Sequence, residues 1–421
     1  MKERRLAIKV MAFVMAGGRG ERLRPLTEDR SKPAVPFGGR YRLVDFVLSN
    51  LVNSGVRAIY LLVQYKAQSL IEHIRKAWNI SPLLQDQFVT VVPPQMKEGT
   101  SWFLGTADAV YQNLNLLKEQ RPDIVAVFGA DHVYRMDVRQ MACFHLQQHA
   151  DVTIAALQIP IEQASRFGII QAATNGRING FQEKPEHPAA MPSNPDRAYA
   201  SMGNYLFNAD VLIEALEESH QRGENDFGLH VLPRLLTSHR LFAYDFSSNE
   251  VPGLKDYEDA DYWRDVGSLD AYFEAHKDML GISPKFDTFN PLWPIFSSND
   301  QGPVTQIIGG QIENSLLGAS TVVNQANIRN SIIRREAVVE PGADIQDCII
   351  MDYVRICSGA RLRRVIVDRH NIIKANSRIG YNLQDDRHRY SVTSSGLVVV
   401  PPGKVDYFAR NSQSVGDDYI R

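Results

Sequence analysis

A glycine-rich segment near the N-terminus is followed at once by basic side chains. An apolar run at residues 10–16 leads into three glycines, Gly17, Gly18 and Gly20. Four basic residues come next: Arg19, Arg22, Arg24 and Lys32. Glycines allow backbone N–H groups to approach an anion closely, and guanidinium groups match the geometry of phosphate oxygens. The segment therefore predicts a binding loop for a polyphosphate.

Two common phosphate-binding loops are excluded by particular residues. The dinucleotide-binding fingerprint requires a glycine three residues after Gly20, where this chain has Leu23. The P-loop requires Gly-Lys-Ser/Thr at the start of a helix, and no such triplet follows. The remaining motif, Gly-Gly-x-Gly-x-Arg-Leu-x-Pro-Leu-Thr with a later Lys-Pro, resembles the signature of the sugar-nucleotide pyrophosphorylases. These nucleotidyltransferases join a nucleoside triphosphate to a sugar 1-phosphate. A solvated basic turn is the alternative, and the many positions matched in fixed order disfavour it.

Two aspartates are candidate ligands for Mg²⁺. Asp131 follows an apolar run at residues 124–129, and Asp265 lies in the segment Tyr-Trp-Arg-Asp-Val-Gly. An aspartate after a strand commonly caps the next helix, and the second segment also fits a structural corner. Mg²⁺ prefers one or two carboxylates together with phosphate oxygens. Beside a triphosphate loop, the presence of both carboxylates favours ligation.

Two further motifs carry residues suited to a phosphorylated sugar and a nucleotide. Glu183 and Lys184 precede a proline, and such a pair is usually solvated surface. Here Lys184 is a candidate point charge for a sugar phosphate, and Glu183 a candidate acceptor for sugar hydroxyls. Gly105 opens a predicted helix after Trp102 and Phe103, so the N–H groups of that helix are candidates for contact with a base or phosphate.

The elements that must position these groups are predicted from hydrophobic patterning. Continuous apolar runs at residues 58–63, 124–129 and 152–157 predict strands, and residues 69–78 predict a helix. Such runs between helices favour an α/β fold, a Rossmann-like, mostly parallel sheet covered on both faces. Ligands bind such sheets beyond the carboxyl ends of the strands. The glycine loop and Asp131 both follow strands at such ends.

The last quarter of the chain is an internal repeat. Hydrophobic units beginning at residues 312, 328, 345 and 362 recur every sixteen or seventeen residues. Three short strands per coil, with an aliphatic residue at every fifth or sixth position, predict a parallel β-helix. An antiparallel sandwich is the alternative, but it does not require repeated hexapeptides. We therefore predict a catalytic domain at residues 1–285, a linker at 286–310 and a β-helix domain for regulation and oligomerisation at 311–421.

Bulk composition excludes several classes of partner. The chain has 421 residues with 46 Lys and Arg against 48 Asp and Glu, so nothing in the balance predicts nucleic-acid or membrane binding. Three cysteines without paired spacing favour a reducing cytoplasm. The basic, apolar N-terminus resembles a signal peptide, but Lys9 interrupts the apolar run, and a buried first strand is the better interpretation.

The resemblance extends over nearly the whole chain and narrows to the bacterial ADP-glucose pyrophosphorylases. The segments that match in order are residues 17–20, 30–39, 45–50, 105–109, 130–134, 167–168, 183–185, 200–203, 226–228 and 262–267. The resemblance implies a left-handed parallel β-helix and conversion of ATP and α-glucose 1-phosphate to ADP-glucose and pyrophosphate for glycogen synthesis. It also implies Mg²⁺ dependence, a homotetramer and control by small metabolites.

Individual roles follow from the resemblance, position by position. Arg22 and Lys32 would hold the triphosphate, and Asp131 and Asp265 would bind Mg²⁺. Residues implied to bind the nucleotide are Gly17, Gly18, Arg19, Gly20 and Gly105. Residues implied to bind glucose 1-phosphate are Phe103, Gly168, Glu183, Lys184 and Ser201. An anionic effector is assigned to Arg30 and Arg42, near Arg361, Arg363 and Arg364, although solvated surface is an equal alternative for this group.

Three positions depart from the family pattern. Asp29 replaces a basic residue linked to activator binding, Phe103 replaces a tyrosine, and Leu229-His230 replaces Lys-Asp. Two other functions remain open: a pyrophosphorylase for another nucleotide or sugar, and a non-catalytic regulatory subunit. The second usually lacks a metal-binding carboxylate or a phosphate-binding cation, whereas this chain keeps all of them. A β-helix acyltransferase is disfavoured, because His370 is the only histidine within the repeats and no acyl site is evident.

Overall fold

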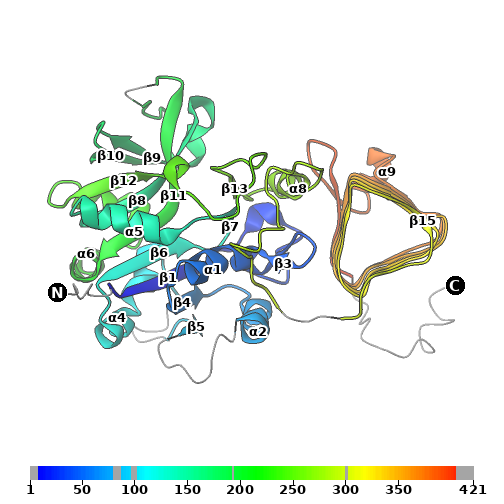
Figure 1. Cartoon of the computed structure of the whole chain (residues 1–421), viewed down its shortest axis with the longest axis horizontal. Helices are drawn as coiled ribbons and strands as arrows, with labels where there is room; N and C mark the ends of the chain where they lie inside the picture. Colours follow the sequence, from blue (N-terminus) through cyan, green and yellow to red (C-terminus); the bar gives the residue numbers. More distant parts are fainter. Residues whose placement is uncertain (1–7, 79–86, 96–101, 192–193, 299–301, 404–421) are drawn as a thin grey trace.

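The computed structural model describes residues 8–78, 87–95, 102–191, 194–298 and 302–403, and it shows an α/β domain joined to a three-sided β-helix (Figure 1). The strands of the α/β domain are β1 (Val10–Ala16), β2 (Pro36–Phe37), β3 (Tyr41–Arg42), β4 (Ala58–Val63), β5 (Phe88–Val92), β6 (Ile124–Gly129), β7 (His132–Tyr134), β8 (Val152–Pro160), β9 (Gly168–Ala172), β10 (Ile178–Glu183), β11 (Arg197–Asn208), β12 (Leu241–Asp245) and β13 (Trp263–Asp265).

The helices of the α/β domain are α1 (Leu43–Asn53), α2 (Gln68–Ala77), α3 (Thr106–Tyr111), α4 (Leu114–Gln120), α5 (Val138–Gln147), α6 (Ala209–Gln221), α7 (Leu232–Leu235) and α8 (Leu269–Lys277). Shorter helical turns are η1 (Glu21–Leu23), η2 (Lys32–Ala34), η3 (Ile161–Arg166), η4 (Phe227–Val231) and η5 (Phe246–Ser248). The strands predicted at residues 58–63 and 124–129 and the helix predicted at 69–78 are confirmed.

The central sheet is mixed. Among the described residues it has nine strands, in the order β10-β9-β11-β6-β1-β4-β5, with β8 paired to β11 and β12. The strands β6, β1, β4 and β5 are parallel, as predicted. The antiparallel part arises because β9 and β10 form a hairpin and the long strand β11 runs against β6, β8 and β9.

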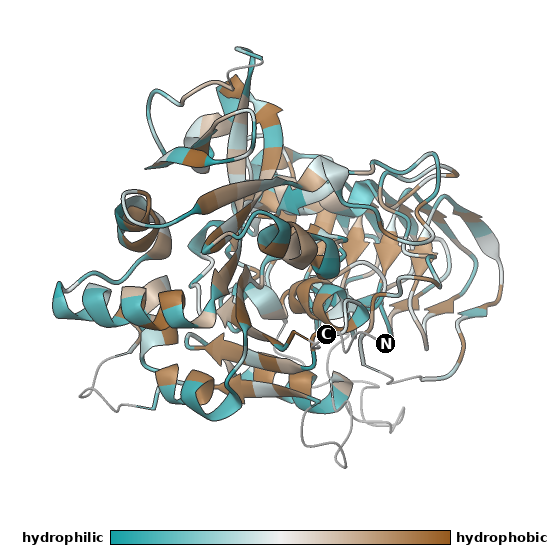
Figure 2. Ribbon diagram, turned by 60° about the vertical axis from the view of Figure 1, so that its left-hand side comes forward, coloured by the Kyte–Doolittle hydropathy of each residue, from teal (hydrophilic) through white to brown (hydrophobic). Residues whose placement is uncertain are grey.

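Burial on both sides explains the unbroken apolar runs. Along β1, Ala12 and Val14 pack into the core on one face of the sheet, and Met11 and Phe13 pack into the core on the other. Residues of α1, α2 and α5 complete the first core, and residues of α3, α4 and α6 complete the second. Figure 2 shows the resulting pattern, with hydrophobic strands inside and hydrophilic outer helix faces. No helix of the described segments is long and apolar enough to cross a bilayer.

The β-helix confirms the repeat seen in the sequence. Its strands are β14 (Gln306–Ile307), β15 (Gly310–Glu313), β16 (Leu316–Leu317), β17 (Val322–Val323), β18 (Ala326–Arg329), β19 (Ile332–Ile333), β20 (Val338–Val339), β21 (Asp344–Gln346), β22 (Ile349–Ile350), β23 (Arg355–Ile356), β24 (Arg361–Arg363), β25 (Val365–Val367), β26 (Ile372–Ile373), β27 (Arg378–Ile379), β28 (Ser391–Val392) and β29 (Val398–Val400), with helix α9 (Leu383–Arg387). From β14 to β27 every third strand stacks in parallel, so three sheets form the sides of the triangle in Figure 1. At the end of the third sheet β29 stacks on β25, and β28 pairs antiparallel with β29.

Residues with left-handed backbone turn the chain at the corners of the triangle. Positive φ recurs every five or six residues, as at Asn314, Ser320, Gln325, Asn330 and Glu336. Asparagine tolerates this conformation better than most residues, which explains Asn314 and Asn330. Between the corners, aliphatic residues such as Ile328, Ile345 and Leu362 stack in register inside the coil and are fully buried.

The two domains share one hydrophobic core. Phe37 and Phe46 of the α/β domain pack in the same buried cluster as Ile349, Ile366 and Val399 of the β-helix. These three residues belong to the sheet β16-β19-β22-β25-β29, so this side of the prism faces the α/β domain. The β-helix is therefore fixed against the segment that follows the glycine loop.

Candidate active site

The glycine loop follows β1 at its carboxyl end, and its geometry depends on Gly20. Gly20 has φ of 63°, which glycine adopts readily. A Cβ atom on Gly20 would lie 3.0 Å from Cβ of Lys32 and 3.2 Å from Cγ2 of Thr27. Gly20 therefore allows the loop to pack directly on the segment that carries Lys32. Gly18 faces open space, with no atom within 4 Å of an added Cβ.

Lys32 lies between the two predicted metal ligands. Its ammonium Nζ is 2.9 Å from Oδ2 of Asp131 and 3.1 Å from Oδ1 of Asp265. The two aspartates come together because β7, which begins directly after Asp131, pairs antiparallel with β13, which ends at Asp265. The structure thus brings together the two carboxylates that the sequence analysis singled out as candidate metal ligands.

The charges in this cluster stabilise one another. Burial alone would lower the pKa of the Lys32 ammonium, but the Asp131 and Asp265 carboxylates outweigh burial and raise it. Burial alone would raise the pKa of Asp131, yet the Lys32 ammonium and His132 hold it well below its ordinary range. Both partners are therefore ionised at neutral pH.

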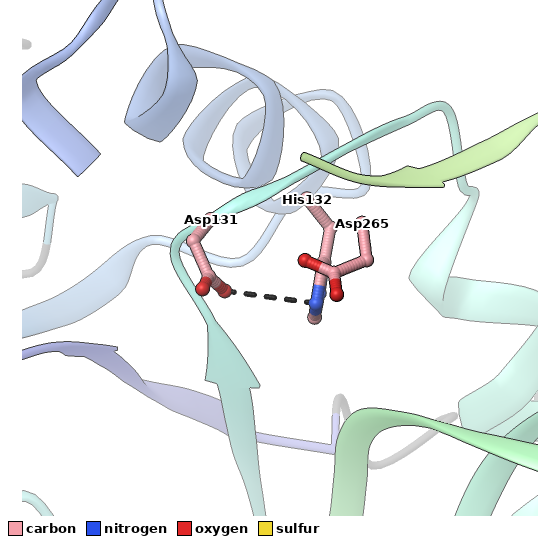
Figure 3. A group of neighbouring side chains, drawn as sticks. All are labelled: Asp131, His132 and Asp265. Carbon is pink, nitrogen blue, oxygen red and sulfur yellow. Dashed lines mark ion pairs between the residues drawn. The ribbon is translucent and has the colours of Figure 1, made fainter. Parts of the chain in front are cut away.

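The donor set fits a divalent cation. Ligand atoms of Asp131, Asp265 and His132 all lie within 4.8 Å of one another (Figure 3). Carboxylates such as those of Asp131, which precedes β7, and Asp265, in β13, are ligands that Mg²⁺ prefers. His132 was not singled out from the sequence, although it stands next to Asp131 in the same motif. Its Nε2 is 3.6 Å from Oδ1 of Asp131, and its ring packs 4.8 Å from the ring of Trp263.

The Arg22 guanidinium lies close to the same cluster, where both it and Asp265 pack against Gly267. A Cβ atom on Gly267 would lie 2.9 Å from Oδ2 of Asp265 and 3.1 Å from Nη2 of Arg22. The Arg22 guanidinium and the Asp265 carboxylate therefore both lie against the Cα atom of Gly267. The role of Gly267 was missed, although it follows Asp265 in the quoted motif. Arg19 is different, because its side chain is 75% exposed and its nearest described acid is Glu21 at 3.8 Å.

Glu183 is packed between two glycines at the end of β10. Its Oε2 would lie 2.9 Å from a Cβ atom on Gly168 and 2.8 Å from one on Gly228. Its other carboxylate oxygen pairs with Lys184, whose side chain is 65% exposed. Larger residues at either glycine would displace the Glu183 carboxylate, so these glycines define its position.

Ser201 lies beside Glu183 through a tyrosine that the sequence prediction did not include. Burial raises the pKa of Tyr205, a hydrogen bond with Ser201 opposes this rise, and the Glu183 and Asp226 carboxylates add to it. Tyr205 therefore contacts Ser201 and lies within the electrostatic influence of Glu183 and Asp226. Tyr205 follows Ser201 by four residues on strand β11, an even spacing that was available from the sequence, although the pairing of β11 with β8 is irregular between the two residues.

Phe103 and Gly105 approach this region from the other side. The backbone N–H of Phe103 donates to Oε1 of Gln64 at 2.7 Å, and Cβ of Gln64 is 3.4 Å from the Cβ position of Gly17. A Cβ atom on Gly105 would lie 2.2 Å from the carbonyl oxygen of Asn225, so only glycine fits there.

The amides at the start of α3 already have a partner. The N–H groups of Ala107 and Asp108 donate to the carbonyl oxygen of Asn225 at 2.9 and 3.3 Å. The expectation that the exposed amides of this helix bind a ligand is therefore wrong for these two groups. Asn225 stands next to Asp226, whose carboxylate accepts from the amides of Gly228 and Leu229.

The predicted effector residues lie at the interface with the β-helix. Arg30 is 2% exposed and forms an ion pair with Asp368. Arg42 donates to the Ser69 hydroxyl and carbonyl oxygens, both at 2.8 Å, and burial lowers its pKa to about 10. The other arginines proposed for this group lie apart: Arg361 and Arg363 are exposed on β24, and Arg364 stacks on Phe273.

Comparison with known proteins agrees with both domains. A family model described as nucleotidyl transferase matches residues 11–281, and a model described as GlmU-like, C-terminal hexapeptide matches residues 304–400. The second match is consistent with the left-handed form of the predicted β-helix.

Curated relatives match nearly the full length of the chain. A glucose-1-phosphate adenylyltransferase of Thermodesulfovibrio yellowstonii is 53% identical over 93% of this chain and 96% of its own. Proteins of the same name from an Anaeromyxobacter species and Corynebacterium jeikeium are 46% and 44% identical, each over 93% of this chain. The chain therefore belongs to the glucose-1-phosphate adenylyltransferase family of nucleotidyl transferases.

Proposed function

We propose that this enzyme transfers the adenylyl group of ATP to α-glucose 1-phosphate, giving ADP-glucose and pyrophosphate for α-1,4-glucan (glycogen) synthesis. A phosphate oxygen of glucose 1-phosphate attacks the α-phosphorus of ATP, and the bond from that phosphorus to the β-phosphate oxygen breaks. The pyrophosphate leaves with its electron pair. The observation that carries this proposal is the cluster of Lys32, Asp131 and Asp265 beside the glycine loop.

The triphosphate is assigned to the glycine loop, Arg22 and Lys32. Gly17, Gly18, Arg19 and Gly20 supply backbone amides and a guanidinium along the loop, and Gly105 lines the approach near Phe103. Lys32 and Arg22 carry fixed positive charge at the place where the pyrophosphate develops negative charge. Removing one such preorganised group commonly lowers the rate by about 10²–10³.

Asp131 and Asp265 are assigned as the residues that hold Mg²⁺. A bound divalent ion would neutralise phosphate charge during the transfer. The Lys32 ammonium, which lies between these carboxylates, keeps them ionised and ready for a cation. A nucleotide arriving with its cation then offers its phosphates as the new partner of Lys32.

The sugar phosphate is assigned to the group of residues around Glu183. Lys184 would bind the phosphate of glucose 1-phosphate, and Glu183 and Ser201 would accept and donate hydrogen bonds to sugar hydroxyls. Gly168 keeps the Glu183 carboxylate in place, and Phe103 supplies an aromatic face without the hydroxyl that relatives have. Tyr205 joins this group because it contacts Ser201.

The reaction requires no protein nucleophile, so the contribution of the enzyme is orientation and charge stabilisation. Two rival functions have to be separated from the proposal by experiment. A pyrophosphorylase for another base would use the same phosphate site, and a regulatory subunit would bind without releasing pyrophosphate.

The deciding experiment measures pyrophosphate release with glucose 1-phosphate, Mg²⁺ and each of ATP, UTP, dTTP and GTP. We expect the highest kcat/KM with ATP. A higher value with another nucleotide would reassign the base. No release with any of the four would contradict the proposed reaction and leave either another sugar phosphate as substrate or the regulatory role.

We also propose a homotetramer that responds to anionic metabolites. The first coil supports assembly, because Val304, Ile307 and Ile308 are 88%, 56% and 54% exposed. Arg30 and Arg42 remain the proposed effector contacts. A cytoplasmic location is part of this proposal, supported by three unpaired cysteines and by the use of ATP.

A further inference from the structure

Arg334 of the β-helix donates hydrogen bonds to the β2–β3 hairpin, which follows Lys32 in the chain. Arg334 is 3% exposed, and its Nη1 lies within hydrogen-bond distance of three backbone carbonyl oxygens of the α/β domain. These belong to Phe37 at 3.1 Å, Gly38 at 2.8 Å and Tyr41 at 3.0 Å. All three carbonyl groups belong to the β2–β3 hairpin, so the Arg334 side chain contacts both ends of its turn.

Asp352 orients this arginine. Nε of Arg334 donates to Oδ1 of Asp352 at 2.8 Å, and Nη2 lies 3.4 Å from Oδ2. The carboxylate thus holds the guanidinium plane on one edge while the opposite edge meets the hairpin. An Arg–carboxylate fork of this kind fixes direction as well as charge.

The chain before Lys32 is held by a second residue of the β-helix. Arg30 forms its ion pair with Asp368 and donates from Nε to the carbonyl oxygen of Leu26 at 2.8 Å. Arg30 precedes Lys32 by two residues, and the hairpin begins four residues after Lys32. Lys32 therefore lies between two contacts that both come from the β-helix.

These contacts come from one corner of successive coils. Arg334, Asp352 and Asp368 follow β19, β22 and β25, which are neighbouring strands of the same parallel sheet. Backbone hydrogen bonds between these strands fix the rise from coil to coil. The corner therefore presents its contacts at rigid intervals along the segment at residues 30–41.

A shift of that segment would reach the triphosphate site directly. Gly20 packs against Lys32, as described above, and the hydroxyl of Thr27 donates to the carbonyl oxygen of Gly20 at 2.8 Å. These contacts couple the glycine loop and Lys32 to the hairpin, so a displacement of the hairpin would displace the loop. A displacement of about 1 Å in such a group can lower a rate by about 10²-fold.

We propose that Arg334, oriented by Asp352, is a positioning residue for the triphosphate site, so that the β-helix is a working part of nucleotide binding. This inference rests on the proposed function, since it assigns Lys32 to the nucleotide. It differs from a general role in joining the domains, because it predicts an effect on one substrate only.

The test compares Arg334→Gln with Arg355→Gln in the full-length chain. Arg355 is a matched control, because its Nε donates to Glu340 at 2.6 Å and both residues belong to the β-helix. For Arg334→Gln we expect kcat/KM for ATP to fall about tenfold to a hundredfold, with KM for glucose 1-phosphate within about twofold of wild type. Arg355→Gln should leave both values unchanged.

Calorimetric titration with MgATP and thermal unfolding of each variant separate the possible outcomes. Weaker MgATP binding by Arg334→Gln at an unchanged unfolding temperature supports the inference. Equal kinetics in the two variants, or parallel losses for both substrates, overturn it. If Arg334→Gln does not fold, the same measurements on Asp352→Asn test the inference. That variant keeps Arg334 but removes the carboxylate charge that orients it. An inactive wild type contradicts the proposed function, while the MgATP titrations still test the positioning role.

Discussion

Lys32 shows how a partly buried charge cluster is prepared for ligands that bring more charge. Its ammonium satisfies two carboxylates that would otherwise repel each other across a gap. Because Lys32 is buried, removal of a carboxylate would leave its charge with fewer partners, which costs free energy. The cluster is thus stable at rest and can exchange Lys32 for a cation that arrives with the triphosphate.

Substitution of Lys32 should separate metal binding from turnover. Lys32→Gln removes the positive charge that competes for Asp131 and Asp265, so without nucleotide we expect Mn²⁺ to bind about tenfold more tightly, a change of about 1.4 kcal/mol. Turnover should nevertheless fall by about 10²–10³. Electron paramagnetic resonance titration with Mn²⁺ and a pyrophosphate assay measure the two quantities.

Asp131→Asn is the contrasting variant, in which both Mn²⁺ binding and turnover should fall. Asp210→Asn, an exposed aspartate at the start of α6, is the control for loss of one carboxylate. Weaker Mn²⁺ binding by Lys32→Gln would show that the lysine does not compete with the metal ion.

At the scale of elements, the β2–β3 hairpin is held from two sides. Arg334 contacts its carbonyl groups, and α8 contacts it from the α/β domain. The N–H of Gly38 donates to Nε2 of His276 at 3.0 Å, and Nδ1 of His276 donates to the carbonyl oxygen of Tyr272 at 2.8 Å. This pattern requires a neutral imidazole with its proton on Nδ1.

His276 should make stability depend on pH in acid. Burial lowers the pKa of His276 to about 3. The hydrogen bond to the Tyr272 carbonyl raises this pKa, and the charge of Arg334 lowers it further. Above about pH 6.5 the imidazole is neutral in both the folded and the unfolded chain. It therefore does not make the free energy of unfolding depend on pH in this range. Between about pH 6.5 and 3 only the unfolded chain binds the proton, so the free energy of unfolding should fall by up to about 1.4 kcal/mol per pH unit. Denaturant unfolding across this range measures the slope, and His276→Gln should reduce it. The same dependence of the free energy of unfolding on pH in wild type and in His276→Gln would contradict this prediction.

The stacked aliphatic residues should carry the stability of the β-helix. Ile345 is fully buried between Ile328 and Leu362, so Ile345→Ala should lower the free energy of unfolding by about 2–5 kcal/mol. The neighbouring Gln346→Ala should change it by less than about 0.5 kcal/mol. Urea denaturation followed by circular dichroism measures both, and similar losses would show that the interior stack is not the main contributor.

At the scale of the whole molecule, the first coil leaves one end of the β-helix open. Strand β14 pairs with β17 on one side, and among the described residues no strand pairs with its other side. An unpaired strand edge with aliphatic side chains is a natural surface for a second copy of the chain.

A lysine on this edge should disrupt the assembly. Ile307→Lys would place a charge within the proposed contact, so we expect the mass measured by light scattering to drop from four copies to two or one. Leu146→Lys on α5, where the side chain is 40% exposed, is the control and should keep the wild-type mass. An unchanged mass for Ile307→Lys would place the contact elsewhere.

Much of this architecture could be predicted because it depends on local pattern. Unbroken apolar runs predicted β4 and β6, and the regular repeat predicted the β-helix. Asp131 and Asp265 could be selected as candidate metal ligands because of their residue type and motifs. The antiparallel strands were not predicted, since their pairing depends on contacts between distant segments. Arg334 was missed for the same reason: a lone arginine at a turn usually indicates exposed surface, and its carbonyl partners are nearly 300 residues away.

The left-handed corners also restrict how the length of this domain can change during evolution. An inserted residue between two corners would move alternate side chains from the interior to the outside. Insertion of a whole coil would leave the other coils intact. Between Arg334 and Asp368 even a whole coil would separate contacts that must meet one short segment. Natural gains and losses should therefore occur as complete coils, and only beyond this stretch.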